Sequence, residues 1–172
     1  DLSLRAEFAA LSGKIVAFSN HFNNFIYLEN TGNEIDGVDV LAYRQQDAIF
    51  QGLEYELDWS FYTSANQTYS VGLFGDRIKG ELDNGDYAPR LPPGHDGVRL
   101  RWQTQDWHAD LSAVFAHAQT KPGASELPTA SYRRFDMTVS RAFEFTDLKY
   151  TLMLKARNLA DQDIRNASSF IR

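Results

Sequence analysis

Apolar and polar side chains alternate along most of the chain. In residues 52–59, "GLEYELDW", one face of an extended strand would carry Leu53, Tyr55, Leu57 and Trp59, and the other Gly52, Glu54, Glu56 and Asp58. A repeat of two residues is typical of a β-strand whose two faces meet different surroundings. Helical periodicity is weak throughout the sequence, so the pattern predicts an all-β fold.

The alternation recurs in separate segments, which are the predicted strands. They are Leu2–Leu11, Lys14–Leu28, Ala48–Tyr62, Thr68–Gly80, Gly97–Gln103, Trp107–Gln119, Tyr132–Phe145 and Lys149–Asn158. Most exceed the usual strand length of soluble proteins, which is about 5–6 residues. They approach the ~9–11 residues of a tilted strand that crosses a bilayer.

The connections between these segments alternate in length. The short ones are Ser12-Gly13, Thr63–Gln67, Thr104–Asp106 and Thr146–Leu148, and the long ones are Glu29–Asp47, Glu81–Asp96, Thr120–Ser131 and the stretch from Leu159 onward. Short turns on one side and long loops on the other are typical of outer-membrane barrels, whose turns lie in the periplasm. The sequence therefore predicts an antiparallel up-and-down transmembrane β-barrel, of which about eight strands are seen.

Charges fill the polar faces of the predicted strands. In "GVRLRWQ", Val98, Leu100 and Trp102 alternate with Arg99 and Arg101. A soluble core rarely holds so many charges, so the apolar faces are predicted to meet lipid and the polar faces to line a water-filled lumen. The predicted lumen-lining residues are Glu54, Glu56, Asp58, Arg99 and Arg101.

Aromatic residues gather where the predicted strands meet the short turns. These residues are Trp59, Phe61, Tyr62, Trp102, Trp107, Phe143 and Phe145. Amphipathic rings form girdles at the membrane interfaces of such barrels. Packing beside the turns of a soluble β-protein is the alternative explanation for their position.

The composition excludes several classes of protein. With 172 residues the chain can form one domain or part of a larger one. It has no cysteine, which excludes disulfides and thiolate metal sites. Its net charge of −6 argues against a nucleic-acid partner, which needs a basic face. No window approaches the ~20 apolar residues of a transmembrane helix.

Candidate ligand-binding residues lie in the long connections. His95 and Asp96 are adjacent near the end of the second long connection, and an imidazole beside a carboxylate is a candidate metal site. The same connection carries Asp83 and Asp86. Carboxylates grouped in one exposed loop also attract cations by their field alone.

The first long connection adds Asp36 and Asp39 on the same predicted side of the barrel. Together the two loops are predicted to capture the ligand. The row Glu54, Glu56 and Asp58 does not predict catalysis, because it spans about 13 Å along a strand. No nucleophile and base pair accompanies the row, so the protein is not predicted to be an enzyme.

Four ordered segments resemble the C-terminal third of TonB-dependent outer-membrane receptors. They are "HFNNFIYLENTG" at His21–Gly32, "YRQQDAIFQGLEYELDW" at Tyr43–Trp59, "APRLPPGHDGVRLRW" at Ala88–Trp102 and "LKARNLADQDIRNASSF" at Leu154–Phe170. The first two are most similar to the zinc-uptake receptors of Gram-negative bacteria. Siderophore and haem receptors share much of the same framework, so they remain an alternative.

The resemblance implies energy-coupled uptake of a scarce nutrient across a Gram-negative outer membrane. Zinc or another metal species, free or as a chelate, would be the transported ligand, and there would be no permanently bound cofactor. The implied partners are outer-membrane lipid and the TonB complex, which would act through a plug domain. Residues 1–172 would form the C-terminal part of a plugged 22-stranded barrel, with the plug and the last strand outside this sequence.

Two other architectures also fit the alternation of apolar and polar residues. One is a self-contained eight-stranded outer-membrane barrel with a structural or enzymatic role, in which the first and last strands would pair. The other is a soluble lipid-binding barrel with its apolar face turned inward. The sorted loops and the charges on the polar faces favour the receptor.

Overall fold

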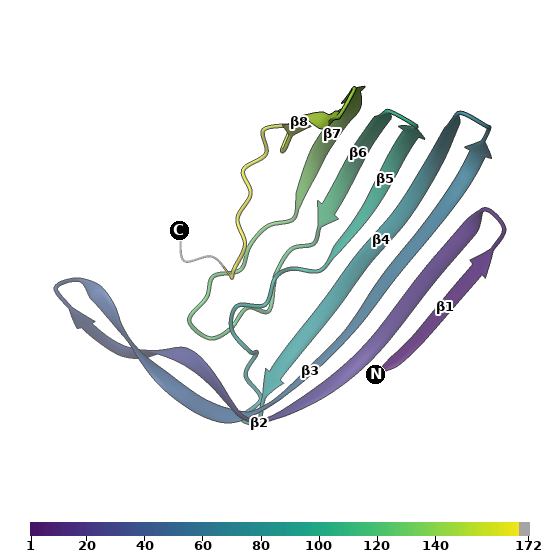
Figure 1. Ribbon diagram of the computed structural model, residues 1–172. Coiled ribbons are helices and arrows are strands. Elements are labelled where there is room, and N and C mark those ends of the chain that lie inside the picture. Colours follow the sequence, from purple (N-terminus) through teal and green to yellow (C-terminus); the bar gives the residue numbers. More distant parts are fainter. Residues whose placement is uncertain (169–172) are drawn as a thin grey trace.

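A computed structural model describes residues 1–168 of the chain, and its strands form one continuous antiparallel sheet (Figure 1). The strands are β1 (Leu2–Phe8), β2 (Leu11–Ile35), β3 (Val38–Thr63), β4 (Gln67–Leu82), β5 (His95–Thr104), β6 (Trp107–Ala116), β7 (Tyr132–Phe145) and β8 (Leu148–Ala156). Their order in the sheet is the order in the sequence. Residues 1–168 contain no helix long and apolar enough to span a membrane.

The first turn lies earlier than predicted. Ala9 and Ala10 connect β1 to β2, and Ala9 takes a left-handed φ of 48°. The predicted turn residues Ser12 and Gly13 are instead paired, opposite Glu7 and Ala6. The prediction of a turn at Ser12-Gly13 was wrong because glycine favours turns in general, whereas here Gly13 lies within the sheet next to Leu57.

The largest correction concerns the first long connection, Glu29–Asp47, which is a hairpin arm and not a loop. β2 and β3 continue their pairing as far as Ile35 and Val38, and Asp36-Gly37 forms the tight turn with φ values of 52° and 77°. Two positive φ values in an Asp-Gly turn match the right-handed twist of a hairpin. The arm extends well beyond the other strands and curves beneath the loops (Figure 1).

The outer face of the sheet is apolar and uncovered. Leu2 and Phe8 of β1 are 75% and 80% exposed, and Leu53, Leu73, Leu100 and Leu111 continue the same face across the sheet. Exposed leucines in this number fit contact with lipid and not with water. The apolar side chains of the strands therefore lie on the uncovered face of the sheet, as predicted.

The opposite face is marked as the inner one by the loops that pack on it. The segment between β4 and β5 folds back so that Ala88 joins a buried cluster with Ala48 and Leu82, against which Phe50 and Leu91 pack. Gly80 permits this approach, since a Cβ there would lie 2.8 Å from Phe50 Cε1 and 2.9 Å from Ala88 Cβ. Phe50 shares its face with Glu54, Glu56 and Asp58, so these carboxylates lie on the inner face.

The predicted aromatic girdle is continuous at the short-turn end of the sheet. The contacts run through Trp59, Phe61, Tyr69, Trp102 and Trp107, with ring centroids 5.9–6.5 Å apart. Arg141 extends the row, because its guanidinium lies over the rings of both Trp107 and Phe143. Phe143 then stacks on Tyr150 at 5.0 Å. The girdle thus crosses the sheet from β3 to β8.

The sheet is open in the part of the chain that the structure describes. β1 pairs with β2 and β8 pairs with β7, and the two edge strands do not pair with each other. A self-contained eight-stranded barrel requires that closing pair. The sheet is therefore a curved sector of a barrel wall.

Candidate functional site

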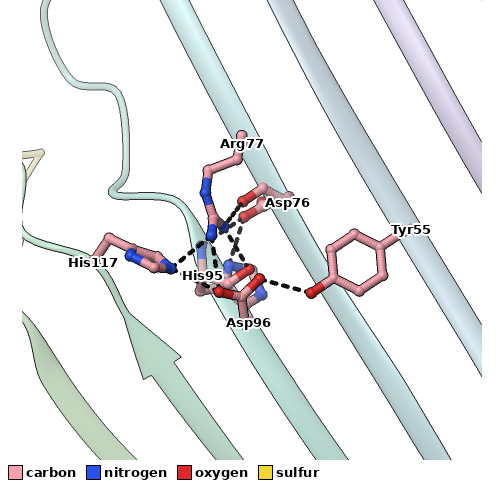
Figure 2. A network of polar contacts seen from close by, with 6 residues as sticks. All are labelled: Tyr55, Asp76, Arg77, His95, Asp96 and His117. Atoms are coloured by element: carbon pink, nitrogen blue, oxygen red, sulfur yellow. Dashed lines mark hydrogen bonds and ion pairs between the residues drawn. The ribbon is translucent and has the colours of Figure 1, made fainter.

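A polar network crosses the outer face of the sheet near the loop end (Figure 2). The Asp96 carboxylate accepts hydrogen bonds from Tyr55 Oη at 2.6 Å and from Arg77 Nη2 at 2.8 Å, and His117 Nε2 lies 2.7 Å from Asp96 Oδ2. Tyr55 belongs to β3, Arg77 to β4 and Asp96 to β5, while His117 follows β6. The network therefore ties four successive parts of the sheet together.

The network depends on a glycine at its centre. Tyr55 on β3 is opposite Gly75 on β4, which is opposite Asp96 on β5. A Cβ on Gly75 would lie 2.6 Å from the Tyr55 hydroxyl and 2.6 Å from the His95 carbonyl oxygen. The missing side chain lets the Tyr55 ring cross β4 and reach Asp96.

Arg77 donates three hydrogen bonds within this network. Nη1 donates to the carbonyl oxygens of Asp76 at 2.6 Å and His95 at 3.1 Å, and Nη2 donates to Asp96. His117 Nε2 lies close to both charged groups, 2.6 Å from Arg77 Nη2 and 2.7 Å from Asp96 Oδ2, and it donates to Asp96 when its proton is on Nε2. An arginine on an apolar face is costly unless it is paired, and this network pairs it.

The prediction that His95 and Asp96 lie in a loop was wrong. They lie at the start of β5, where neighbouring side chains point to opposite faces. His95 Nδ1 contacts Asp76 Oδ1 at 2.7 Å on the inner face, whereas Asp96 belongs to the outer network. Within residues 1–168, no three His, Asp or Glu side chains converge closely enough to hold a metal ion. The assignment of His95 and Asp96 as metal ligands stays a prediction.

The predicted lumen-lining residues share the inner face and form part of a charged row. Arg99 lies 4.0 Å from Glu56 and 3.7 Å from Asp110, and Arg101 is also 3.7 Å from Asp110. Arg99 additionally stacks over the Phe74 ring at 4.9 Å. Glu54 and Asp58 lie on β3 to either side of Glu56 and on its face. Alternating charges of this kind suit a water-filled wall.

A groove of about 710 Å³ separates the hairpin arm from the loops. Charges of both signs line it, together with apolar side chains; they include Glu34, Asp39, Arg90, Glu126, Leu127 and Arg165. The volume is within the ~300–1,000 Å³ range of small-molecule pockets. Of the predicted capture residues, Asp39 lines this groove, whereas Asp36 lies at the tip of the hairpin.

The other two predicted capture residues lie in the turn after β4. The backbone N–H of Asp83 donates to the Asp47 carbonyl oxygen, and the Asp86 carboxylate accepts from Asn84 Nδ2 at 2.7 Å. Asp86 borders a smaller pocket beside Tyr27 and Tyr87. The four carboxylates are therefore spread over the loop end and do not form one cluster.

The loops that border the groove are fastened to each other. Glu126 Oε1 accepts from the backbone N–H of Arg90 at 2.6 Å, and Glu126 Oε2 accepts from that of Gly123 at 3.0 Å. Ser125 Oγ accepts from the backbone N–H of Asn30 on the hairpin arm at 3.1 Å. Glu126 therefore joins the two loops, and Ser125 joins the second loop to the arm.

Tyr55, Arg77 and His117 were not among the predicted site residues, although the sequence carried a signal for Arg77. Arg77 is in phase with Leu73 and Gly75, and Asp96 is in phase with Val98 and Leu100, so both charges interrupt apolar faces. Charges that interrupt two neighbouring apolar faces are expected to be paired. Glu126 and Arg165 gave no such signal, because loop packing does not follow a period.

Comparison with protein families matches residues 1–159 to the family described as "TonB dependent receptor-like, beta-barrel". The chain belongs to this family. Members of the family are transporters, and the receptor is accordingly not an enzyme. Membership of this family excludes the soluble lipid-binding barrel, which the alternation of apolar and polar residues also allowed.

The receptor sector is also similar to the solved structure of a copper transporter, OprC. The TM-score is 0.76, the sequence identity is 15%, and the likeness covers 96% of this chain and 26% of that chain. At this identity the likeness supports the fold alone. The sector thus spans about a quarter of that larger chain, in agreement with its open sheet.

Proposed function

We propose that this chain is part of an outer-membrane receptor of Gram-negative bacteria that imports a scarce metal species. Uptake would be coupled to energy through the TonB complex, which pulls on a plug domain in the complete protein. Family membership over residues 1–159 is the observation that carries the proposal. The charged inner wall and the exposed apolar outer face are consistent with a receptor that spans the outer membrane.

Zinc is the metal that we propose first, because two segments of the sequence are most similar to zinc-uptake receptors. The fold similarity to a copper transporter is compatible with a metal cargo and makes copper the second candidate. The groove next to the arm carries charges of both signs, and no set of three metal-ligating side chains converges in residues 1–168. These features suit a metal complex with its own ligands better than a bare ion.

Uptake of radioactive zinc and copper by intact cells tests this proposal. Cells that lack the complete receptor gene should take up less zinc than wild-type cells in metal-depleted medium, and the restored gene should recover uptake. Unchanged uptake of both metals, supplied as ions and as complexes, would overturn the proposal. If iron siderophore or haem uptake fell instead, the alternative cargo within the family would replace it.

Two site variants test the predicted capture residues in the same assay. Asp39→Asn on the groove and His95→Ala on the inner face should each reduce zinc uptake at low zinc concentration. Asp147→Asn is the matched control, because Asp147 lies in the short turn between β7 and β8, at the opposite end of the sheet. Equal uptake by all three variants would remove Asp39 and His95 from the capture path.

A further inference from the structure

A groove of about 550 Å³ opens between β6, β7 and the segment after β8. Its side chains are of two kinds. Phe115 and Phe135 are apolar, whereas His117, Ser131, Arg133 and Gln162 are polar. The groove does not involve the arm or the inner wall, so the inference that follows is independent of the proposed cargo.

The groove lies on the lipid-facing side of the sheet. Phe115 is in phase with Leu111 and Trp107 on β6, and Arg133 is directly opposite Phe115 on β7. Phe135 is two residues further along the same face of β7. His117 contacts the outer network through Asp96. The groove is therefore continuous with the apolar surface that meets the hydrocarbon region.

Arg133 lies at the outer boundary of that apolar surface. Between Arg133 and Arg141 the outward side chains of β7 are Phe135, Met137 and Val139. The two arginines are eight residues apart, which corresponds to about 26 Å along a strand and about 20 Å in height at the usual tilt. The apolar band of outer-membrane barrels is about 25 Å tall, only a few ångströms more than this height. Because an arginine side chain is long enough to span that difference, both charged groups reach an interface.

The two arginines differ in the groups that their side chains contact. Arg141 stacks on Trp107 and Phe143 in the aromatic girdle. Arg133 is exposed, and no carboxylate in residues 1–168 lies within ion-pair distance of it. The nearest outward carboxylate in the register, Asp96, is already bonded to Arg77 and Tyr55. An arginine without a carboxylate partner, next to the apolar side chains Phe115 and Phe135, is complementary to a lipid with an anionic headgroup and an acyl chain.

We propose that this groove binds one anionic membrane lipid, with its phosphate on Arg133 and an acyl chain along Phe115 and Phe135. His117 and Ser131 border the headgroup position. The lipid would cover the upper edge of β7, whose pairing with β8 begins only at Met137. Lipid binding there would fix the depth of this part of the barrel wall in the bilayer.

Native mass spectrometry of the complete receptor in a neutral detergent tests this site. The probes are phosphatidylglycerol, diacylglycerol with the same acyl chains, and inorganic phosphate. We expect saturable binding of phosphatidylglycerol, weaker binding of diacylglycerol, and no binding of phosphate alone. Retention of phosphate without a preference for the lipid would overturn the proposal in favour of a simple anion site.

Variants separate this groove from general attraction to the barrel. Arg133→Gln should weaken the tightest phosphatidylglycerol binding about tenfold, as expected for loss of one charge-assisted contact. Phe135→Ser should weaken it to a similar extent. Arg134→Gln removes the same charge one residue away, but Arg134 bonds Asp136 on the inner face, so binding should change less than twofold. Equal effects of Arg133→Gln and Arg134→Gln, or no effect of Arg133→Gln, would overturn the proposal.

The thermal unfolding midpoint of each complete variant provides the folding control. Arg133 is exposed and unpaired within residues 1–168, so Arg133→Gln should unfold at the wild-type temperature without added lipid. Phosphatidylglycerol should raise the unfolding temperature of the wild-type receptor and of Arg134→Gln, and raise that of Arg133→Gln much less. An equal rise in all three proteins would contradict the site.

Discussion

Removal of the Asp96 carboxylate is the sharpest test of the outer-face network. Asp96→Ala deletes the acceptor for Tyr55, Arg77 and His117, whose donor atoms lie 2.6, 2.8 and 2.7 Å from it. It also leaves the Arg77 charge without its carboxylate on the apolar face. We expect the free energy of unfolding of the complete receptor to fall.

The magnitude follows from the number and kind of the lost bonds. A net hydrogen bond contributes about 1 kcal/mol and one to a charged group about 1.5–3 kcal/mol. The Asp96 and Arg77 side chains are 38% and 46% exposed, which reduces their contribution. We therefore expect a loss of about 2–4 kcal/mol for Asp96→Ala. Tyr55→Phe, which removes one bond, should cost about 1 kcal/mol.

Urea unfolding of the complete receptor in lipid vesicles, followed by tryptophan fluorescence, measures these losses. Glu81→Ala is the matched control, because it breaks the exposed ion pair between Lys79 and Glu81, which are two residues apart on β4. Exposed pairs contribute less than about 1 kcal/mol. If Asp96→Ala were no more destabilising than Glu81→Ala, the network would not hold the strands together and the reasoning would fail.

Three further predictions follow from the sheet. Gly75→Ala should lower the unfolding temperature by several degrees, because its Cβ would displace the Tyr55 ring. A Cβ on Gly13 would come closest to the movable Leu57 Cδ1, at 3.2 Å, so Gly13→Ala should be nearly neutral. Equal midpoints for the two variants would contradict this reasoning. The girdle tryptophans should be quenched more by lipids brominated near the headgroup than by lipids brominated near the chain end. A single cysteine at Asp36 should react with an impermeant maleimide on intact cells, and one at Ala10 only after permeabilisation. The opposite result would mean that the short turns, and not the hairpin arm, face the cell exterior.

The sequence predicted the faces of the sheet better than its connections. The alternation of Leu53 and Tyr55 with Glu54 and Glu56 was predicted from lipid on one side and water on the other, and the structure confirms that the two pairs lie on opposite faces of β3. The hairpin arm was predicted as a loop because both of its faces are outside the bilayer. Without a difference between the faces, alternation fades, and only Asp36-Gly37 remained as a hairpin signal.

The predicted site was less accurate, because proximity in sequence was taken as proximity of side chains. His95 and Asp96 are neighbours in the chain, yet the pleat separates them onto opposite faces of β5. The groove residues come from the arm, two loops and the segment after β8, which are brought together by bonds such as Glu126 to Arg90. Such contacts between distant segments have no periodic signature in the sequence.

The same pleat gives neighbouring charges separate roles. Asp76 and His95 bond to each other on the inner face, while Arg77 and Asp96, one residue further along each strand, bond on the outer face. An inner pair meets water and the path of the cargo, so its loss should alter uptake more than stability. An outer pair meets lipid, where an unpaired charge is costly, so its loss should alter stability first. Asp76→Asn and Asp96→Asn, compared in both assays, would therefore separate transport from assembly at positions that are adjacent in the wall.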